Sequence, residues 1–111
     1  MRAEVSVFAT GSRRDEILRT LRWLMGQLEA WPGLEEADLY RTLDQEGKVV
    51  LMQRWRTRED LVGYVCSEEF VQLLEVMDLS EKPPELRFET VSKREGLELV
   101  RALRNKELVN P

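Results

Sequence analysis

The chain has 111 residues, of which 42% are hydrophobic and 34% charged, and its formal net charge is -4. This size and balance are typical of one globular domain, so we expect residues 1–111 to form a single domain. Histidine is absent and Cys66 is the only cysteine. Histidine triads, histidine metal or haem ligands and an intramolecular disulfide are therefore excluded, and we expect neither a metal nor a cofactor.

The longest uninterrupted apolar run, Val49 to Met52, is too short to cross a membrane. The N-terminus lacks the charged-then-apolar pattern of a signal peptide, so we predict a cytoplasmic protein. Basic and acidic residues are interleaved, which argues against nucleic acid or a membrane surface as the partner.

The first 30 residues predict a strand and a helix. Alternating apolar residues over 3–9 indicate the strand. Ser12 followed by Asp15 is typical of a capping box, so we expect the helix to begin near Arg13 and to end near Ala30, before a Pro-Gly pair. Its apolar positions have helical spacing and are Ile17, Leu18, Leu21, Leu24, Met25 and Leu28.

A hairpin and a broken helix follow. Alternation over 37–44 and 48–55, with a short Gly-containing turn between them, predicts two antiparallel strands. Thr57 is placed to cap the next helix, and Ser67 indicates a kink or a restart. The predicted buried positions of this region are Leu61, Tyr64, Val65, Phe70, Leu73, Leu74 and Met77.

The remaining residues predict a fourth strand at Leu86 to Val91 and a terminal helix. Ser92 and Glu95 form a second capping-box pattern, and the helix is expected to fray before Pro111. The order βαββαβ plus one helix is that of an α+β, ferredoxin-like fold.

Two helices would cover one face of a four-stranded antiparallel sheet. Depending on the register, the other face carries some of Phe8, Tyr40, Val50 and Met52. An uncovered apolar face needs a partner, so we expect a homodimer stacked sheet to sheet. The alternative is that the terminal helix covers this face.

Residues from Gly33 to Thr90 carry a family resemblance. They include the strand VVLMQRW, the helix entry Trp55-x-Thr57-x-Glu59-Asp60-Leu61, and the segment SEEFVQLL. The chain resembles the antibiotic biosynthesis monooxygenase family of dimeric α+β barrels. The resemblance implies cofactor-independent oxygenation of a small aromatic or quinol-type substrate.

Other members of that family degrade haem with an Asn, a His and a Trp. Only the Trp is present here, as Trp55; the chain has no His, and its asparagines are Asn105 and Asn110. Leu51 occupies the strand position where oxygenases of the family often have Asn, and Tyr64 the helix position where many relatives have His. The catalytic residues are thus left open.

We predict a pocket where the third strand meets the next helix. Gln53 shares a strand face with Leu51 and Trp55, and Tyr64 and Phe70 lie on the helices that follow. Trp55 suits stacking on a flat ligand, and Tyr64 suits donating a hydrogen bond. The structural alternatives are core packing for both aromatics and a structural hydrogen bond for Gln53.

Four further side chains have structural interpretations. Arg54 points away from the pocket and is placed to pair with an acidic residue at the dimer interface. Cys66 is predicted to be buried and inert, while Trp23 and Trp31 are predicted to pack at the ends of the first helix. Three functions stay open: an oxygenase, a non-catalytic dimer that binds a small apolar ligand or a protein, and a purely structural dimer with a filled core.

Overall fold

The computed structural model describes residues 1–109, with side chains through Asn105. Its elements in chain order are β1 (Arg2–Phe8), the 3-10 helix η1 (Gly11–Arg13), α1 (Arg14–Leu28), β2 (Leu34–Arg41), β3 (Lys48–Trp55), α2 (Arg58–Val65), α3 (Glu68–Asp78), β4 (Glu85–Glu89) and α4 (Leu97–Val109). The predicted ferredoxin-like α+β fold is confirmed. Among the described residues, no helix is long and apolar enough to cross a bilayer.

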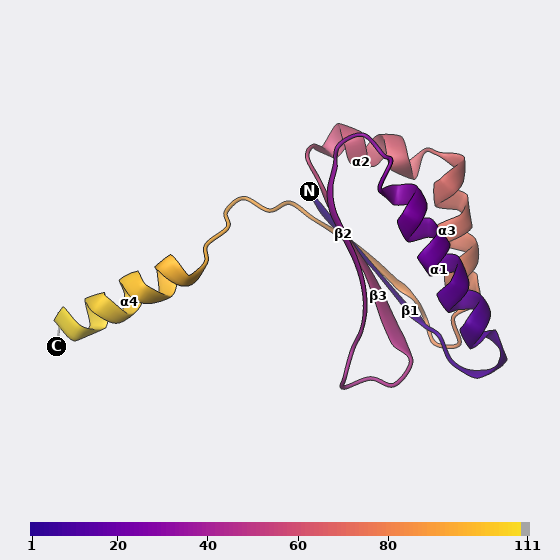
Figure 1. The fold of residues 1–111 in the computed structure, drawn as a ribbon, viewed down its shortest axis with the longest axis horizontal. Helices are drawn as coiled ribbons and strands as arrows, with labels where there is room; N and C mark the ends of the chain where they lie inside the picture. The colour runs from indigo at the N-terminus through magenta and orange to yellow at the C-terminus, as the bar shows by residue number, and fades with distance from the viewer. Residues whose placement is uncertain (110–111) are drawn as a thin grey trace.

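The four strands form one antiparallel sheet in the order β2-β3-β1-β4. Helices α1, α2 and α3 lie on one side of it (Figure 1). The core fills the space between the sheet and these helices, and its fully buried side chains include Val5, Ile17, Leu21, Leu51 and Leu73. Alternation along β1 and β3 therefore reports correctly which residues face the helices.

The helix boundaries follow from their caps. The Thr57 hydroxyl accepts a hydrogen bond from the Asp60 amide at 3.1 Å, and the Ser67 hydroxyl accepts one from the Phe70 amide at 3.3 Å. These two caps make α2 and α3 separate helices, which confirms the predicted restart at Ser67.

The two predicted capping boxes are wrong. Ser12 lies within the 3-10 helix η1 instead of capping α1, and α1 has no side-chain cap. Residues 90–96 are irregular, so α4 begins at Leu97 rather than directly after Ser92. At the start of α4, the Glu98 carboxylate accepts a hydrogen bond from the Gly96 amide at 3.0 Å.

The side of the sheet away from the helices is called the open face here. The register places Phe8, Tyr40, Val50 and Met52 on it, as predicted. Charged residues surround them and are linked through Glu4, which contacts three side chains. Glu4 forms an ion pair with Arg2 at 3.1 Å and one with Arg87 at 3.9 Å, and it accepts a hydrogen bond from the Tyr40 hydroxyl at 3.2 Å.

Helix α4 does not cover the open face. It projects from the rest of the molecule at the end of the extended segment 90–96 (Figure 1). The radius of gyration is 17.6 Å, whereas a compact chain of this length has about 13 Å. The alternative role predicted for the terminal helix is therefore wrong, because the helix stands clear of the sheet.

Candidate functional site

The five residues of the predicted pocket come together between β3 and the helices. Leu51, Gln53 and Trp55 alternate along β3 and point toward α2 and α3. Tyr64 is in the last turn of α2, and Phe70 is in the first turn of α3. All five side chains are buried. Whether they bind a ligand stays a prediction.

An aromatic cluster occupies this region. Trp55 and Tyr64 are stacked with their ring centroids 5.3 Å apart, and Phe70 meets the Tyr64 ring edge-on at 5.5 Å. Trp31 makes a second edge-on contact with Tyr64, also at 5.5 Å. Tyr64 is therefore enclosed by three aromatic rings, an arrangement that stabilises the cluster beyond the area it buries.

Trp31 also belongs to this cluster. The sequence predicted it only as a residue that packs at the end of the first helix. It begins a turn, Trp31–Leu34, in which the Leu34 amide donates to the Trp31 carbonyl at 3.3 Å. Gly33 has φ +84, and a side chain there would collide with Asp60. Pro followed by Gly is typical of a type II turn, so the Trp-Pro-Gly sequence was the available signal.

Two polar groups lie inside the cluster. The Gln53 amide oxygen accepts a hydrogen bond from Trp55 Nε1 at 2.9 Å, which is the structural role predicted as its alternative. The Tyr64 hydroxyl is buried and has no hydrogen-bond partner among the described residues. An unpaired buried hydroxyl costs free energy, so a ligand that accepts its proton would bind favourably here.

The environment of Tyr64 keeps its hydroxyl protonated. Burial raises the pKa of Tyr64 to about 12; the nearby Gln53 amide opposes this shift, and the charge of Glu69 adds to it. Gln53 lies close enough to affect the pKa, although the two groups do not align as a hydrogen bond. At neutral pH the Tyr64 hydroxyl is therefore a hydrogen-bond donor and not a general base.

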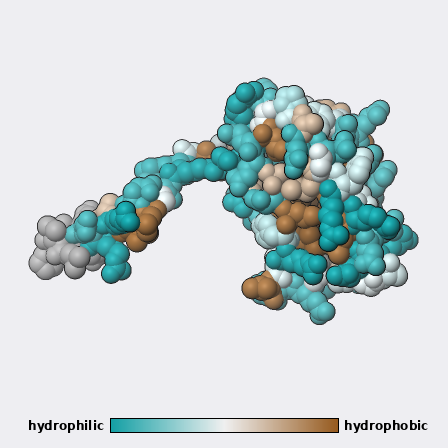
Figure 2. Space-filling view, in the orientation of Figure 1, coloured by the Kyte–Doolittle hydropathy of each residue, from teal (hydrophilic) through white to brown (hydrophobic). Residues whose placement is uncertain are grey.

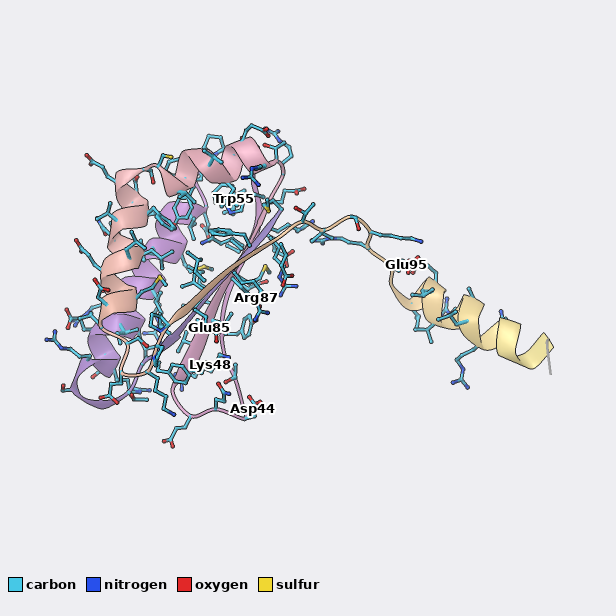
Figure 3. The ribbon with its side chains drawn as sticks, turned by 180° about the vertical axis from the view of Figure 1, so that it is seen from behind. Asp44, Lys48, Trp55, Glu85, Arg87 and Glu95 are labelled. Atoms are coloured by element: carbon cyan, nitrogen blue, oxygen red, sulfur yellow. The ribbon has the colours of Figure 1, made fainter. Side chains whose placement is uncertain are left out.

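Trp55 lies at the end of the sheet next to α2, at the opposite end of β3 from Lys48 (Figure 3). A depression of about 240 Å³ adjoins Trp55. Its lining contains four basic residues, Arg54, Arg56, Lys93 and Arg94, together with the acidic Glu35. Three of the basic side chains form ion pairs: Arg54 with Glu36 at 3.0 Å, Arg56 with Asp60 at 3.4 Å and Lys93 with Glu95 at 2.6 Å. Among the described ion pairs Arg94 takes part in none, so the attraction of this depression for an anion rests mainly on that residue.

Three other predictions about single residues need correction. Cys66 is exposed rather than buried, because it lies at the C-terminal end of α2 where the chain turns outward. Trp23 is on the outer side of α1 and is 46% exposed. Leu74 is exposed on α3, and Val76 is buried in its place because the inward side follows Phe70, Leu73 and Val76.

The fold and this enclosed aromatic site place the chain in the class of ferredoxin-like α+β proteins with a candidate pocket between sheet and helices. The family model for antibiotic biosynthesis monooxygenases matches residues 2–76. The chain belongs to the antibiotic biosynthesis monooxygenase family.

Solved structures have the same fold. A crystal structure of an antibiotic biosynthesis monooxygenase matches with a TM-score of 0.68 and 18% identity, covering 81% of this chain and 97% of the other. A Mycobacterium tuberculosis protein matches with a TM-score of 0.73 and 20% identity, covering 85% and 97%. A Deinococcus radiodurans protein matches with a TM-score of 0.74 and 9% identity, covering 85% and 95%. No curated protein sequence matches the chain.

Proposed function

We propose that the protein is a cofactor-independent monooxygenase that oxidises a small phenol or quinol-type substrate beside Trp55. The buried Tyr64 hydroxyl, protonated and without a partner, is the observation that carries the proposal. A hydrogen bond from this hydroxyl to the substrate oxygen would stabilise the substrate anion, which is the form that reacts with oxygen.

The proposed reaction needs only the substrate and molecular oxygen. The phenolate passes one electron to O₂, which gives a phenoxyl radical and superoxide. These two combine at a ring carbon to form a peroxide, and loss of water from the peroxide leaves a quinone. Overall, one phenol and one O₂ give one quinone and one water, whose two hydrogens come from the hydroxyl and the ring carbon. In this scheme the protein binds the substrate, favours its ionisation and excludes solvent.

The substrate would approach at the end of the sheet where Trp55 lies and bind on the helix side of β3, where the rings of Trp55 and Tyr64 offer flat apolar surfaces. The depression lined by Arg54 and Arg94 opens on the other side, toward the open face, and could only draw an anion to this end of the sheet. Entry requires the stacked rings to separate, because both side chains are 1% exposed in this structure. The substrate ring would then lie against Trp55 or Tyr64 and replace the contact that these two rings make with each other.

Oxygen uptake with a panel of phenols and hydroquinones tests the proposal. Tyr64→Phe should lower kcat/KM by about 100-fold, the effect of removing one donor to a developing oxyanion. The variant should fold at least as stably as the parent, because it removes an unpaired buried hydroxyl. Uptake by the parent no faster than by Trp55→Ala and Tyr64→Phe would refute the oxygenase.

The second candidate is a non-catalytic module that binds a small apolar molecule or a protein. Close stacking of Trp55 on Tyr64 favours it, because a filled aromatic cluster needs no substrate to be stable. Ligand binding with quenching of tryptophan fluorescence, but without oxygen uptake, would identify this function.

We also infer that the working unit is a homodimer stacked through the open face. Phe8, Tyr40, Val50 and Met52 lie there with no helix over them. The antiparallel sheet would thus be covered by helices on one side and by a second copy on the other.

A further inference from the structure

Helix α4 carries an apolar stripe that has no partner among the described residues. Leu97, Val100 and Leu103 recur every three residues and are 60%, 48% and 54% exposed. The space-filling view shows apolar residues gathered on this helix, away from the rest of the molecule (Figure 2). An isolated helix of this length is marginal in water, so its stripe needs a surface to pack on.

Helix α3 has a matching exposed stripe on its outer side. Val71 and Leu74 are 50% and 42% exposed, although the opposite side of the same helix is buried in the core. Helix α3 therefore has apolar residues on two sides, which is more than contact with one core requires.

The charges beside the two stripes are complementary. Helix α3 contains four acidic residues and no basic one, and Glu68, Glu75 and Asp78 lie on the same side as Val71 at helical spacing. Arg101 and Arg104 lie beside the stripe of α4, whereas the acidic Glu98 of its first turn is held at the helix start by a hydrogen bond from the Gly96 amide. Neither these two arginines nor the three acidic residues beside Val71 take part in an ion pair within the described part of the chain.

We propose that α4 of one copy docks on the outer face of α3 of a second copy. The apolar stripes would meet, and Arg101 and Arg104 would lie opposite Glu68, Glu75 and Asp78 of the partner. The two surfaces of one chain lie on opposite sides of the sheet, because segment 90–96 leaves beside Arg2 and Met52 on the open face. If each copy docks its α4 on α3 of the other, both contacts form within a dimer and no further chain is needed.

This contact goes beyond the proposed function and depends on neither the pocket nor the sheet-to-sheet pair. The family model ends at residue 76, so α4 lies outside the part of the chain that it matches. Changes in α4 therefore test the contact while leaving the site beside Trp55 intact.

Cross-linking between two differently tagged variants tests the proposal. Both carry Cys66→Ser, since Cys66 is exposed; one adds Val71→Cys and the other Val100→Cys. A short bismaleimide should give about tenfold more mixed product than the matched pair of Gln72→Cys with Val100→Cys, because docking raises the local thiol concentration. Mixed product at the control level would overturn the proposal.

Two further arms sharpen the test. Arg101→Glu with Arg104→Glu should weaken the association about tenfold, and Glu68→Lys with Glu75→Lys on the partner should restore it. A chain that carries both Val71→Cys and Val100→Cys detects docking within one molecule. An intramolecular cross-link as the main product would overturn docking between copies.

Discussion

At the scale of single residues, the environment of Tyr64 decides what the candidate site can do. Three aromatic rings surround it, and its hydroxyl is the buried polar group without a partner at the site. With its pKa raised to about 12, this hydroxyl keeps its proton at neutral pH, so it can donate a hydrogen bond to a bound group but cannot act as a general base.

The raised pKa of Tyr64 predicts a loss of stability in alkali. Below its ordinary pKa of 10.0, the hydroxyl is protonated in both the folded and the unfolded chain. Between pH 10.0 and about 12, the unfolded chain releases this proton and the folded chain keeps it, so the free energy of unfolding falls. The loss attributable to Tyr64 should approach roughly 2 kcal/mol by the upper end of that range.

Urea unfolding between pH 9 and 11.5 measures this loss (values chosen to bracket the onset of tyrosine ionisation). Tyr64→Phe should flatten the alkaline decline relative to the parent protein. Tyr40→Phe is the matched control, because Tyr40 is exposed on the open face and its pKa is raised by modest burial and by Glu4. Equal slopes for the parent and Tyr64→Phe would show that Tyr64 ionises normally.

At the scale of elements, the caps of α2 and α3 fix the direction of Tyr64. Thr57 caps α2 two residues after Trp55, and Ser67 caps α3 three residues after Tyr64. The Ser67 hydroxyl also donates to the Tyr64 carbonyl at 2.6 Å. The break between the two helices therefore places Tyr64 between Trp55 and Phe70.

Removing a cap should destabilise the protein in proportion to its hydrogen bonds. Thr57→Ala should lower the free energy of unfolding by about 1 kcal/mol, since the Asp60 amide loses its acceptor. Ser12→Ala is the matched control and should change it by only a few tenths, because Ser12 provides no cap. Equal effects of the two changes, measured in urea, would contradict the assigned caps.

The sequence predicts these elements where the signal is local and fails where it depends on tertiary contacts. Alternation along 48–55 correctly places Gln53 beside Trp55, and Thr57 and Ser67 are correct caps. Ser12 has a capping pattern, yet the chain forms η1 there instead. The Trp-Pro-Gly sequence indicates the turn at Trp31, but the contact of Trp31 with Tyr64 joins residues far apart in sequence, so the turn alone does not predict it.

At the scale of the whole molecule, the open face and α4 are two separate surfaces for association. The open face has an apolar centre within a charged network. The stripe on the outer side of α3 is flanked by acidic residues, and that of α4 has Arg101 and Arg104 beside it, with Glu98 in the first turn of the helix. The order of strands and helices predicted from the sequence accounts for the open face. The second surface was not predicted, because Leu74 was assigned to the core and α4 was considered only as a cover for the sheet.

A single charge on the open face should separate the sheet-to-sheet dimer. Met52→Lys places an ammonium between Asp38 and Glu4, which a single chain tolerates. A dimer would have to bury that charge, so its dissociation constant should rise at least about tenfold. Sedimentation equilibrium measures it, with Arg101→Glu and Arg104→Glu present in both proteins to weaken the α4 contact equally. A parent that sediments as one chain at micromolar concentration would contradict this dimer.

The extended segment 90–96 also has an evolutionary consequence. It joins α4 to a sheet whose core and pocket do not depend on that helix. Changes in α4 therefore leave the packing around Trp55 unaltered. The self-association proposed for α4 and the function proposed for the site beside Trp55 could thus evolve independently in this chain.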